Sequence, residues 1–335
     1  MGKVNQQIII DQFSTPSEGV CIRDGEYKSP GPKEITIKTG YCPINPADLN
    51  VIEGKYGKIP KLPAIIGNEG SGHVVEVGKD CENLSEGDHV LYLNRQDCWQ
   101  QFVTATPEDI IKLPNSLPLE LSSMLKVNPA TAWLLLKQFP IIDSPKWLVQ
   151  NASNSGVGVA VIQLAKTFGI KTINFVRREE CKEQLISMGA DVVLMDNEAG
   201  KKEALELLKE KDIELPLAIN AVGGESALRL MSLLSTNGTH VTYGAMSKRP
   251  LKIPNSFLIF KNLTIKGLWL SRWLNSEKKN KIEEVYHNLA NKMLEGNMDQ
   301  PVDSIYDIDQ LVEAINRSMQ EGRKGKVLIN FHDRD

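Results

Sequence analysis

One turn of the chain, Ser153-Asn154-Ser155-Gly156-Val157-Gly158, combines small residues in the spacing that a nucleotide-binding loop needs. A dinucleotide pyrophosphate requires a tight turn, a close approach of the backbone and the free N–H groups of a helix start. Gly156 and Gly158 provide small size at the two closest contacts. Serines replace the first two glycines of the usual G-x-G-x-x-G pattern, so the turn alone is equally typical of a plain strand-to-helix connection. The apolar strand before it and the apolar helix after it favour the dinucleotide site.

The end of the next expected strand indicates which dinucleotide this is. An NAD site usually places Asp or Glu there to bind the ribose 2′-OH, whereas an NADP site replaces it with a cation for the 2′-phosphate. Here the strand ends in Val176-Arg177-Arg178-Glu179. Guanidinium groups bind phosphate well, often through two hydrogen bonds. The sequence therefore predicts NADPH, while two solvated arginines at a helix start, or NADH bound through Glu179, stay open as alternatives.

The histidines and cysteines do not form a metal-binding pattern. Five of each occur, and they are dispersed without a C-x-x-C pair or a cluster of four cysteines. The sequence therefore predicts no metal. Without a Lewis acid, reduction of an activated C=C bond is more natural hydride chemistry than oxidation of an alcohol.

These residues lie in two regions whose sequence patterns predict different secondary structure. Up to about residue 118, Gly and Pro separate short β-type runs at 35–39, 72–78 and 88–93. From about residue 120, strands alternate with helices, which predicts βαβ units and a parallel sheet. The expected strands are 147–151, 171–176, 191–195, 217–222, 239–243, 264–270 and 326–331, and the expected helices are 119–126, 129–139, 157–168, 179–188, 203–209, 226–235, 276–294 and 308–319.

Composition restricts the class of protein. The chain has 335 residues, 41% hydrophobic and 24% charged, with a formal net charge of −3. This length suggests two domains. The slight negative charge argues against nucleic-acid binding, and no apolar run is long enough to span a membrane. An odd number of scattered cysteines is typical of reduced thiols in a cytosolic protein.

Short motifs of unusual composition are distributed along nearly the whole chain. They are INPAD at 44–48, GKYG at 54–57, GNEG at 67–70, VNP at 127–129, QNASNSGVG at 150–158, VGG at 222–224, TYG at 242–244 and GLWLSRW at 267–273. With these motifs the chain resembles the zinc-free medium-chain dehydrogenase/reductases, and within them the 2-enoyl thioester reductases of the mitochondrial trans-2-enoyl-CoA/ACP type. The asparagine-serine turn and the tryptophan segment are specific to that branch, whereas general quinone reductases usually carry a Gly/Ala-rich turn.

The resemblance implies an α/β fold of two domains. A GroES-like catalytic β domain would comprise residues 1–124 and 270–335, and an inserted Rossmann domain, residues 125–269, would bind NADPH. The active cleft would lie between the two domains. The family also implies a homodimer joined through the Rossmann sheets.

The resemblance assigns roles to individual residues. Tyr56, in the G-x-Y-G segment, matches the family's proton donor. The positions that match its NADPH contacts are Asn128, Asn154, Ser155, Gly156, Val157, Arg177, Arg178, Tyr243, Gly244, Ala245, Met246, Leu268, Trp269, Leu270, Ser271 and Lys326.

The chain departs from the family pattern at several positions. Asn68 stands beside Glu69 where a zinc-dependent alcohol dehydrogenase would have His, and 45–48 lacks the expected thiolate. The usual Arg-Asp-Arg is Arg177-Arg178-Glu179 here, and a second glycine after Gly244 is Ala245. No transit peptide precedes residue 1, which predicts a bacterial-type cytoplasmic protein.

The implied reaction is conjugate reduction of an enoyl-CoA or enoyl-acyl-carrier-protein. Hydride from NADPH adds to the β-carbon of the thioester, and the α-carbon of the resulting enolate takes a proton from Tyr56, directly or through water. Without the family resemblance, Tyr56 is interpreted as a loop or packing residue.

Trp269 and Trp273 are candidates for an acyl pocket or for core packing. Lysines at 55, 58 and 61 either attract an acidic CoA or carrier protein or are merely solvated.

Two other functions stay open from the sequence. A quinone or alkenal reductase of the same superfamily would use NADPH but ignore CoA thioesters. A scaffold or regulator that has lost catalysis would bind NADPH and turn over nothing. The complete G-x-Y-G setting of Tyr56 favours an enzyme without excluding the scaffold.

Overall fold

The computed structural model describes residues 4–93, 97–139 and 147–332. Contacts divide the chain into two compact units. The β-rich unit comprises Met1–Val127, Glu277–Gly296 and Gln300–Asp335, and the parallel-sheet unit comprises Asn128–Ser276 and Asn297–Asp299. The domain ranges expected from the sequence stay a prediction beside this division.

The parallel-sheet unit contains six strands that are all parallel. They are β9 (Trp147–Gln150), β10 (Lys171–Val176), β11 (Val192–Met195), β12 (Leu217–Asn220), β13 (Thr239–Thr242) and β14 (Thr264–Gly267). Their order in the sheet is β11-β10-β9-β12-β13-β14, so the direction of winding reverses between β9 and β12. This is the strand order of the dinucleotide-binding Rossmann fold, and ligands of such sheets bind beyond the carboxyl ends of the strands at the reversal.

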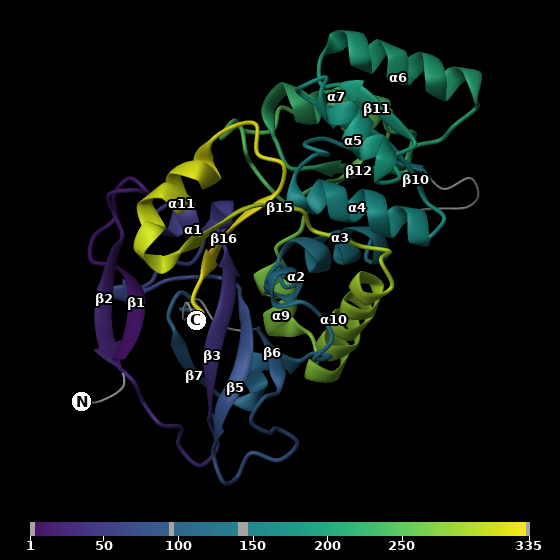
Figure 1. The fold of residues 1–335 in the computed structure, drawn as a ribbon. Helices are drawn as coiled ribbons and strands as arrows, with labels where there is room; N and C mark the ends of the chain where they lie inside the picture. The colour runs from purple at the N-terminus through teal and green to yellow at the C-terminus, as the bar shows by residue number, and fades with distance from the viewer. Residues whose placement is uncertain (1–3, 94–96, 140–146, 333–335) are drawn as a thin grey trace. The chain divides into compact units, whose positions relative to one another are not determined.

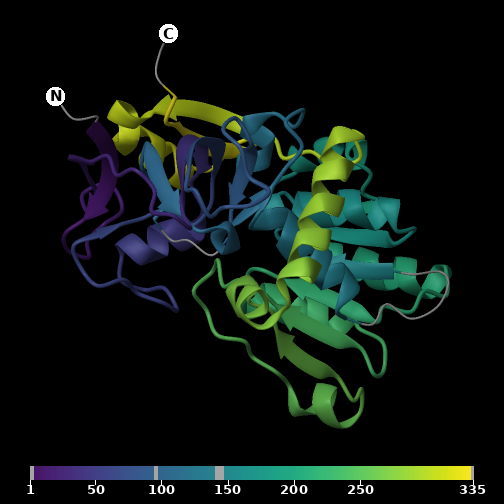
Figure 2. The same ribbon diagram turned by 90° about the horizontal axis from the view of Figure 1, so that it is seen from below.

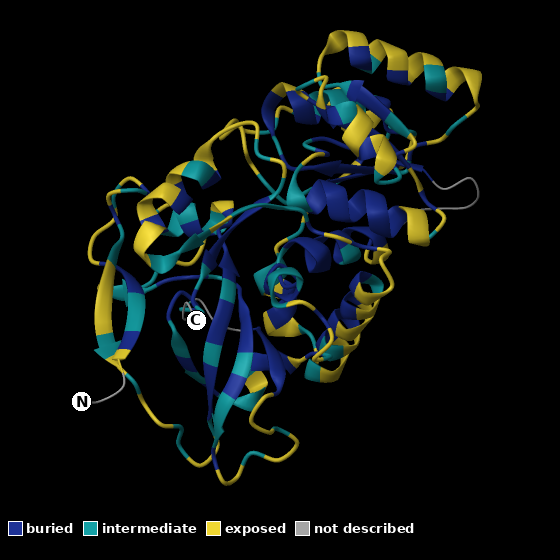
Figure 3. Cartoon of the chain, viewed as in Figure 1, coloured by how far each residue is buried: buried dark blue, intermediate teal, exposed yellow. Residues whose placement is uncertain are grey.

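Helices cover both faces of this sheet. The helices of this unit are α3 (Asn128–Lys137), α4 (Gly156–Thr167), α5 (Cys181–Ser187), α6 (Glu198–Glu210), α7 (Gly224–Leu233), α8 (Asn255–Ile259) and α9 (Leu270–Ser276). Figure 1 shows α3 and α4 together on one side of the sheet and α6 and α7 on the other. Successive residues of a strand pack into the cores on opposite faces of the sheet. Phe175 packs with α6 and α7, whereas Val176 packs with α4 and α5. Helix α4 is almost wholly buried, while α6 exposes its outer side (Figure 3).

The β-rich unit is built on two sheets. The smaller has the order β2-β1-β4, and the larger has β15-β16-β3-β5-β6-β8, with β7 paired to β3. The strands are β1 (Val4–Ile10), β2 (Cys21–Glu26), β3 (Ile35–Pro43), β4 (Ala64–Ile65), β5 (Ser71–Val77), β6 (His89–Tyr92), β7 (Phe102–Ala105), β8 (Ile110–Lys112), β15 (Val302–Asp307) and β16 (Lys326–Asn330).

Helices and the C-terminal segment complete this unit. The helices are α1 (Pro46–Ile52), α2 (Leu119–Ser123), α10 (Lys279–Leu294) and α11 (Leu311–Met319), with short 3-10 turns at Pro107–Asp109 and Ile308–Gln310. Strand β16 pairs antiparallel with β3, so the C-terminal segment lies beside N-terminal strands, as both views show (Figures 1 and 2). None of the helices in the described residues combines the length and apolar composition that crossing a bilayer requires.

Several expected elements have different bounds, and hydrogen bonds explain two of the differences. The strand expected at 264–270 ends at Gly267, and Leu270 already begins α9. The apolar run there continues a strand-like pattern, but the backbone N–H of Arg272 bonds to the Trp269 carbonyl and turns the chain helical. The helix expected at 203–209 is the longer α6, because Asn197 caps its start by accepting a hydrogen bond from the Gly200 N–H.

The core of the parallel-sheet unit contains one unpaired imidazole. His240 of β13 is fully buried and lies in register with Ala218 of β12 and Ile265 of β14. Neither ring nitrogen has a hydrogen-bond partner among the described residues. Burial therefore lowers the pKa of His240 to about 4.

We expect His240→Leu to lose less stability on acidification than the wild type. An unfolded histidine binds its proton near pH 6.5, whereas folded His240 binds it only near pH 4. Falling pH between these values therefore favours the unfolded state, by about 3 kcal/mol at pH 4. Urea unfolding at neutral pH and at about pH 4.5 measures the difference. The control is His287→Leu at an exposed position, and equal pH dependence in His240→Leu and wild type would contradict the prediction.

Candidate active site

The turn before α4 is built for a close approach of the backbone. The side chain of Ser155 caps α4 by accepting a hydrogen bond of 3.1 Å from the Gly158 N–H. Ala152 has a φ of 48°, in the left-handed region that residues other than glycine rarely adopt. Asn154 is exposed beyond the turn, and Val157 is buried beneath it. The first turn of α4 thus begins at a compact loop that presents polar groups.

The close approach depends on Gly158. A Cβ atom at this position would lie 2.5 Å from the Ser153 carbonyl oxygen and 2.7 Å from that of Ala152. These are backbone atoms, so the turn itself would have to move.

We expect Gly158→Ala to lower the free energy of unfolding by about 1–3 kcal/mol, because it overpacks this contact. We expect the same displacement to weaken NADPH binding as well, if the predicted site lies at this turn. Thermal unfolding and NADPH fluorescence titration measure the two effects. Gly31→Ala is the control, since its added Cβ would meet only the flexible Glu34 side chain. Unchanged stability in Gly158→Ala would contradict the contact.

A buried amide pair joins the strands at the point where the winding reverses. Asn151, directly after β9, donates to the Asn220 Oδ1 at the end of β12, at 2.8 Å, and accepts from the Ala221 N–H, also at 2.8 Å. The Asn220 Oδ1 also accepts from the backbone N–H groups of Val222 and Gly223. This pair fixes both loops that follow the two strands.

Further groups that sequence reasoning missed support this pair. The Asn151 side chain also donates to Ser226, whose hydroxyl donates to the buried carboxylate of Asp196 at the end of β11. Arg229 forms an ion pair of 2.8 Å with the same carboxylate. The signal in the sequence is the polar residue directly at the end of three otherwise apolar strands, Gln150-Asn151, Asp196 and Asn220.

The loops after β13 and β14 reach the same edge. Tyr243–Met246 follow β13, with the Met246 N–H bonded to the Ala221 carbonyl, and Leu268–Ser271 follow β14. The Tyr243 hydroxyl oxygen is buried without a hydrogen-bond partner among the described residues. Burial raises the pKa of Tyr243, and the nearby Ser155 acts in the opposite direction. A buried hydroxyl beside the start of α4 suits a polar ligand atom there.

The two arginines lie at the carboxyl end of β10. Arg177 is exposed, and Arg178 is partly exposed with an ion pair of 3.5 Å to Glu180. Glu179 is itself paired with Lys182 at 2.8 Å. The carboxylates of Glu179 and Glu180 are therefore each paired with a neighbouring cation.

The sheet thus brings most of the predicted cofactor residues to one edge. All of them except Asn128 and Lys326 follow the carboxyl ends of parallel strands or begin α4. Asn128 is buried at the start of α3, and Lys326 begins β16 in the β-rich unit. The helix start, the unpartnered Tyr243 hydroxyl and the arginines fit a dinucleotide with a 2′-phosphate.

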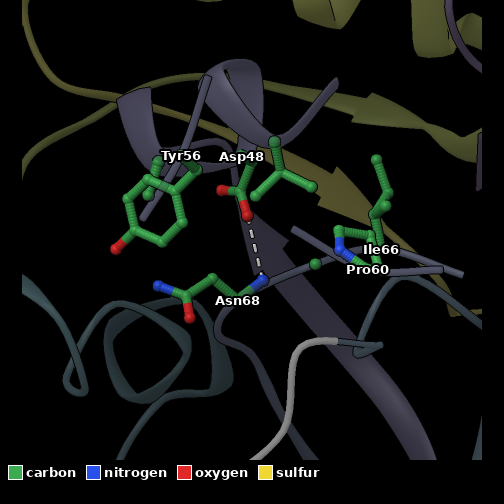
Figure 4. A pocket seen from close by; sticks show the side chains of 8 residues that line it. Asp48, Tyr56, Pro60, Ile66 and Asn68 are labelled. Carbon is green, nitrogen blue, oxygen red and sulfur yellow. Dashed lines mark hydrogen bonds between the residues drawn. The ribbon is translucent and has the colours of Figure 1, made fainter. Parts of the chain in front are cut away.

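A small pocket in the β-rich unit contains Tyr56. Its lining residues are Ala47, Asp48, Val51, Tyr56, Pro60, Ile66, Gly67 and Asn68. The enclosed volume of about 20 Å³ has room for about one water molecule. Figure 4 shows the ring of Tyr56 beside Asp48, with the hydroxyl directed away from the carboxylate. Tyr56 is partly buried and lines the pocket with its ring.

Behind the pocket lies a buried charge cluster, which consists of Asn45, Asp48, Glu69, Lys126 and Lys326. The side-chain amide of Asn45 donates to Glu69 at 2.7 Å, and its backbone N–H donates to Asp48 at 2.8 Å. The second oxygen of Asp48 accepts from the Asn68 N–H at 2.9 Å, and that of Glu69 accepts from the Val127 N–H at 2.8 Å. Lys326 donates to Asn45, and Lys126 donates to the Asn68 carbonyl.

Burial dominates the protonation of this cluster. It raises the pKa of Asp48 to about 7, with a further increase from Glu69, and it raises the pKa of Glu69. Burial also lowers the pKa of Lys126 and of Lys326, against the attraction of the two carboxylates. Burial thus disfavours the charged form of all four groups, and their mutual attraction opposes it.

The cluster occupies the region where the sequence departs from zinc-dependent relatives. Its carboxylate oxygens are already engaged by backbone and amide donors, and two lysines provide the positive charge. Across residues 4–93, 97–139 and 147–332, no three His, Cys, Asp or Glu side chains converge as a metal site. The prediction of no metal stays a prediction.

The two tryptophans have different environments. Trp269 is 40% exposed, and Trp273 of α9 is buried. Burial favours the packing interpretation of Trp273, and the acyl-pocket interpretation of the two residues stays a prediction.

Comparisons with known proteins place the chain in a family. Residues 31–114 match the alcohol dehydrogenase GroES-like domain, and residues 156–291 match the zinc-binding dehydrogenase domain. The mitochondrial enoyl-[acyl-carrier-protein] reductase of Rattus norvegicus is 37% identical over 93% of this chain and 85% of its own length. The chain belongs to the enoyl thioester reductase family. The Homo sapiens enoyl-[acyl-carrier-protein] reductase is 35% identical over 97% of this chain and 88% of its own length.

Solved structures agree with membership of the enoyl thioester reductases. The mitochondrial 2-enoyl thioester reductase Etr1p/Etr2p heterodimer from Candida tropicalis superposes with a TM-score of 0.88 at 29% identity, over 98% of this chain and 100% of that one. The Etr1p/NADP/crotonyl-CoA complex gives 0.89 at 29% identity, with the same coverage. These matches confirm the predicted family and the predicted medium-chain dehydrogenase/reductase fold. A NADPH:quinone reductase from Bacillus thuringiensis, described as putative, has a TM-score of 0.91 at 24% identity and shares the fold.

Proposed function

We propose that this protein reduces the C2=C3 double bond of a trans-2-enoyl thioester, with NADPH as the reductant. The observation that carries the proposal is 37% identity over 93% of the chain to an enoyl-[acyl-carrier-protein] reductase. The Etr1p structure with NADP and crotonyl-CoA, at 29% identity over 98% of the chain, supports the same chemistry. The products are the saturated acyl thioester and NADP⁺.

The cofactor, when bound, supplies a hydride for the β-carbon of the substrate. The chain's own residues hold it through the edge of the parallel sheet. The start of α4, capped by Ser155, offers N–H groups to the pyrophosphate, and the Tyr243 hydroxyl, which has no hydrogen-bond partner among the residues that the structure describes, lies beside it. Arg177 and Arg178 bind the 2′-phosphate and so select NADPH over NADH.

We expect Arg178→Gln to weaken NADPH binding about 10- to 100-fold, because a charge-assisted hydrogen bond contributes about 1.5–3 kcal/mol. NADH lacks the 2′-phosphate, so its affinity stays within about twofold. Fluorescence titration with both cofactors measures the ratio. Arg23→Gln, at an arginine paired with Asp11 in the β-rich unit, is the control. An equal loss of affinity for NADH would contradict the proposal that Arg178 binds the 2′-phosphate.

Tyr56 supplies the proton in this proposal. Hydride addition leaves an enolate, and its α-carbon must be protonated to give the saturated thioester. The hydroxyl of Tyr56 can donate its proton directly or through the single water that the pocket accommodates.

NADPH oxidation with three substrates side by side tests the function. These are crotonyl-CoA, a longer 2-enoyl-CoA and a simple quinone. We expect rapid turnover of the enoyl thioesters. Turnover of the quinone alone would assign the protein to the quinone reductases, and tight NADPH binding without any turnover would favour a scaffold.

We also propose a homodimer that forms through β14. This strand ends the order of the six-stranded sheet, and most of its residues are exposed, so one edge is open to pairing. The neighbouring α8 segment exposes large apolar side chains, with Ile259 at 69% and Phe260 at 79%. A second copy related by a two-fold axis would cover both features. Sedimentation equilibrium should give twice the chain mass of 37.3 kDa, and a monomer would contradict the proposal.

A cytoplasmic location is our proposal for the cell. The five cysteines are free thiols, which fit a reducing compartment. The relatives named above are mitochondrial proteins. Fractionation of the source cells distinguishes the two locations.

A further inference from the structure

The loop that carries Tyr56 also carries an isolated group of positive charges. Lys55, Lys58 and Lys61 recur at every third position of Lys55–Lys61, here named the basic loop, and all three are exposed. Lys55 forms an ion pair of 3.3 Å with Glu53. Lys58 and Lys61 form no ion pair with the described residues. Since the chain as a whole has a net charge of −3, this is a local reversal of sign.

The basic loop forms one side of the Tyr56 pocket. Tyr56 and Pro60 line the pocket (Figure 4), while the residues between and beside them face solvent. One of these, Ile59, is apolar and 46% exposed. Whatever contacts the exposed side of this loop therefore lies beside the pocket that contains the proposed proton donor.

We propose that the basic loop is the docking surface for an acidic acyl-carrier protein, which presents the enoyl thioester at the Tyr56 pocket. This inference rests on the proposed function and names the form in which the substrate arrives. Unpaired lysines at a surface raise the rate at which an acidic partner associates, more than they add contact energy.

The pattern fits a protein surface better than the phosphates of CoA. A compact phosphate site typically uses arginine forks or the N–H groups of a helix start, and the basic loop has neither. Lysines spread along a loop match acidic side chains that are spread over a partner. An exposed apolar residue among them, Ile59, resembles the apolar centre with a polar rim that protein interfaces have.

The test compares the double variant Lys58→Glu/Lys61→Glu with the wild type. Lys55 is left unchanged because it neighbours Tyr56. The substrates are crotonyl thioesters of a purified acidic acyl-carrier protein, of CoA and of N-acetylcysteamine. We expect the KM for the carrier thioester to rise about 10-fold with kcat unchanged, and the other two KM values to change less than about twofold. Added salt should raise the wild-type carrier KM and shrink this difference.

A matched control uses the same charge change elsewhere in the unit. Lys33 and Lys79 are exposed in turns beside the paired ends of β3 and β5, where Ile35 faces Val77. The nine residues of β3 place that end about 30 Å along the strand from the end that leads to the pocket. Lys33→Glu/Lys79→Glu should therefore leave all three KM values at the wild-type level.

Each other outcome overturns the proposal. An equal rise for the carrier and CoA thioesters, with N-acetylcysteamine unchanged, would show that the lysines bind the phosphates of CoA. No change with any substrate would make them plain solvated lysines. Failure of the proposed function itself is distinguishable, because wild-type enzyme would then not reduce even the N-acetylcysteamine thioester.

Discussion

Replacing Tyr56 by phenylalanine should lower kcat for crotonyl-CoA by about 100- to 10,000-fold while NADPH binding stays unchanged. A positioned general acid contributes about this much to a rate. The change removes one oxygen from a partly buried side chain of the pocket, so the loop and its packing are retained. Stopped-flow measurement of NADPH oxidation gives kcat, and fluorescence titration gives the NADPH affinity.

The control for this prediction is Tyr306→Phe. Tyr306 lies on β15 of the same unit, is partly buried and packs against the core outside the pocket. It should retain wild-type kcat. A Tyr56→Phe enzyme that turns over crotonyl-CoA at the wild-type rate would show that the proton comes from another group, and the loop interpretation of Tyr56 would then hold.

The polar edge of the parallel sheet could be predicted because its signals are local. The turn at 153–158 follows an apolar strand and precedes an apolar helix, and both elements are recognisable within about twenty residues of the chain. The position of Arg177 and Arg178 then follows, since parallel strands end at the same edge of a sheet. The Asn151 and Asn220 pair was not predicted because nothing in either strand indicates that the two become neighbours at the reversal of winding.

The buried charge cluster could not be predicted for a related reason. Asn45 contacts Glu69, which is 24 positions away in the sequence, and Lys326, which is 281 positions away. The second contact exists only because β16 pairs with β3.

Several strands of the β-rich unit also lack the alternation of polar and apolar residues that predicts a strand. β2, with the sequence CIRDGE, is an edge strand with mostly polar residues, so tertiary pairing rather than local pattern determines it.

Replacing Glu69 by glutamine should lower the free energy of unfolding by about 3–5 kcal/mol. The change removes one of the two carboxyl groups whose charge attracts the buried Lys126 and Lys326, and a buried charge that loses its compensation costs about that amount. The glutamine NH₂ must also face either the Asn45 amide or the Val127 N–H, which are both donors. Urea unfolding at neutral pH measures the loss. Glu86→Gln, the same change at an exposed position, should stay within about 0.5 kcal/mol.

A double variant keeps this prediction decisive if Glu69→Gln does not fold. Glu69→Met/Lys326→Met removes one acid and one base together, so no new uncompensated charge stays buried. A buried ion pair replaced by apolar side chains often costs little. In a double-mutant cycle, the loss of stability in the double variant should therefore be about 2 kcal/mol smaller than the sum of the losses in Glu69→Met and Lys326→Met. Additive losses would mean that Glu69 acts only through its backbone and amide hydrogen bonds, and that the charge of Lys326 is balanced from elsewhere.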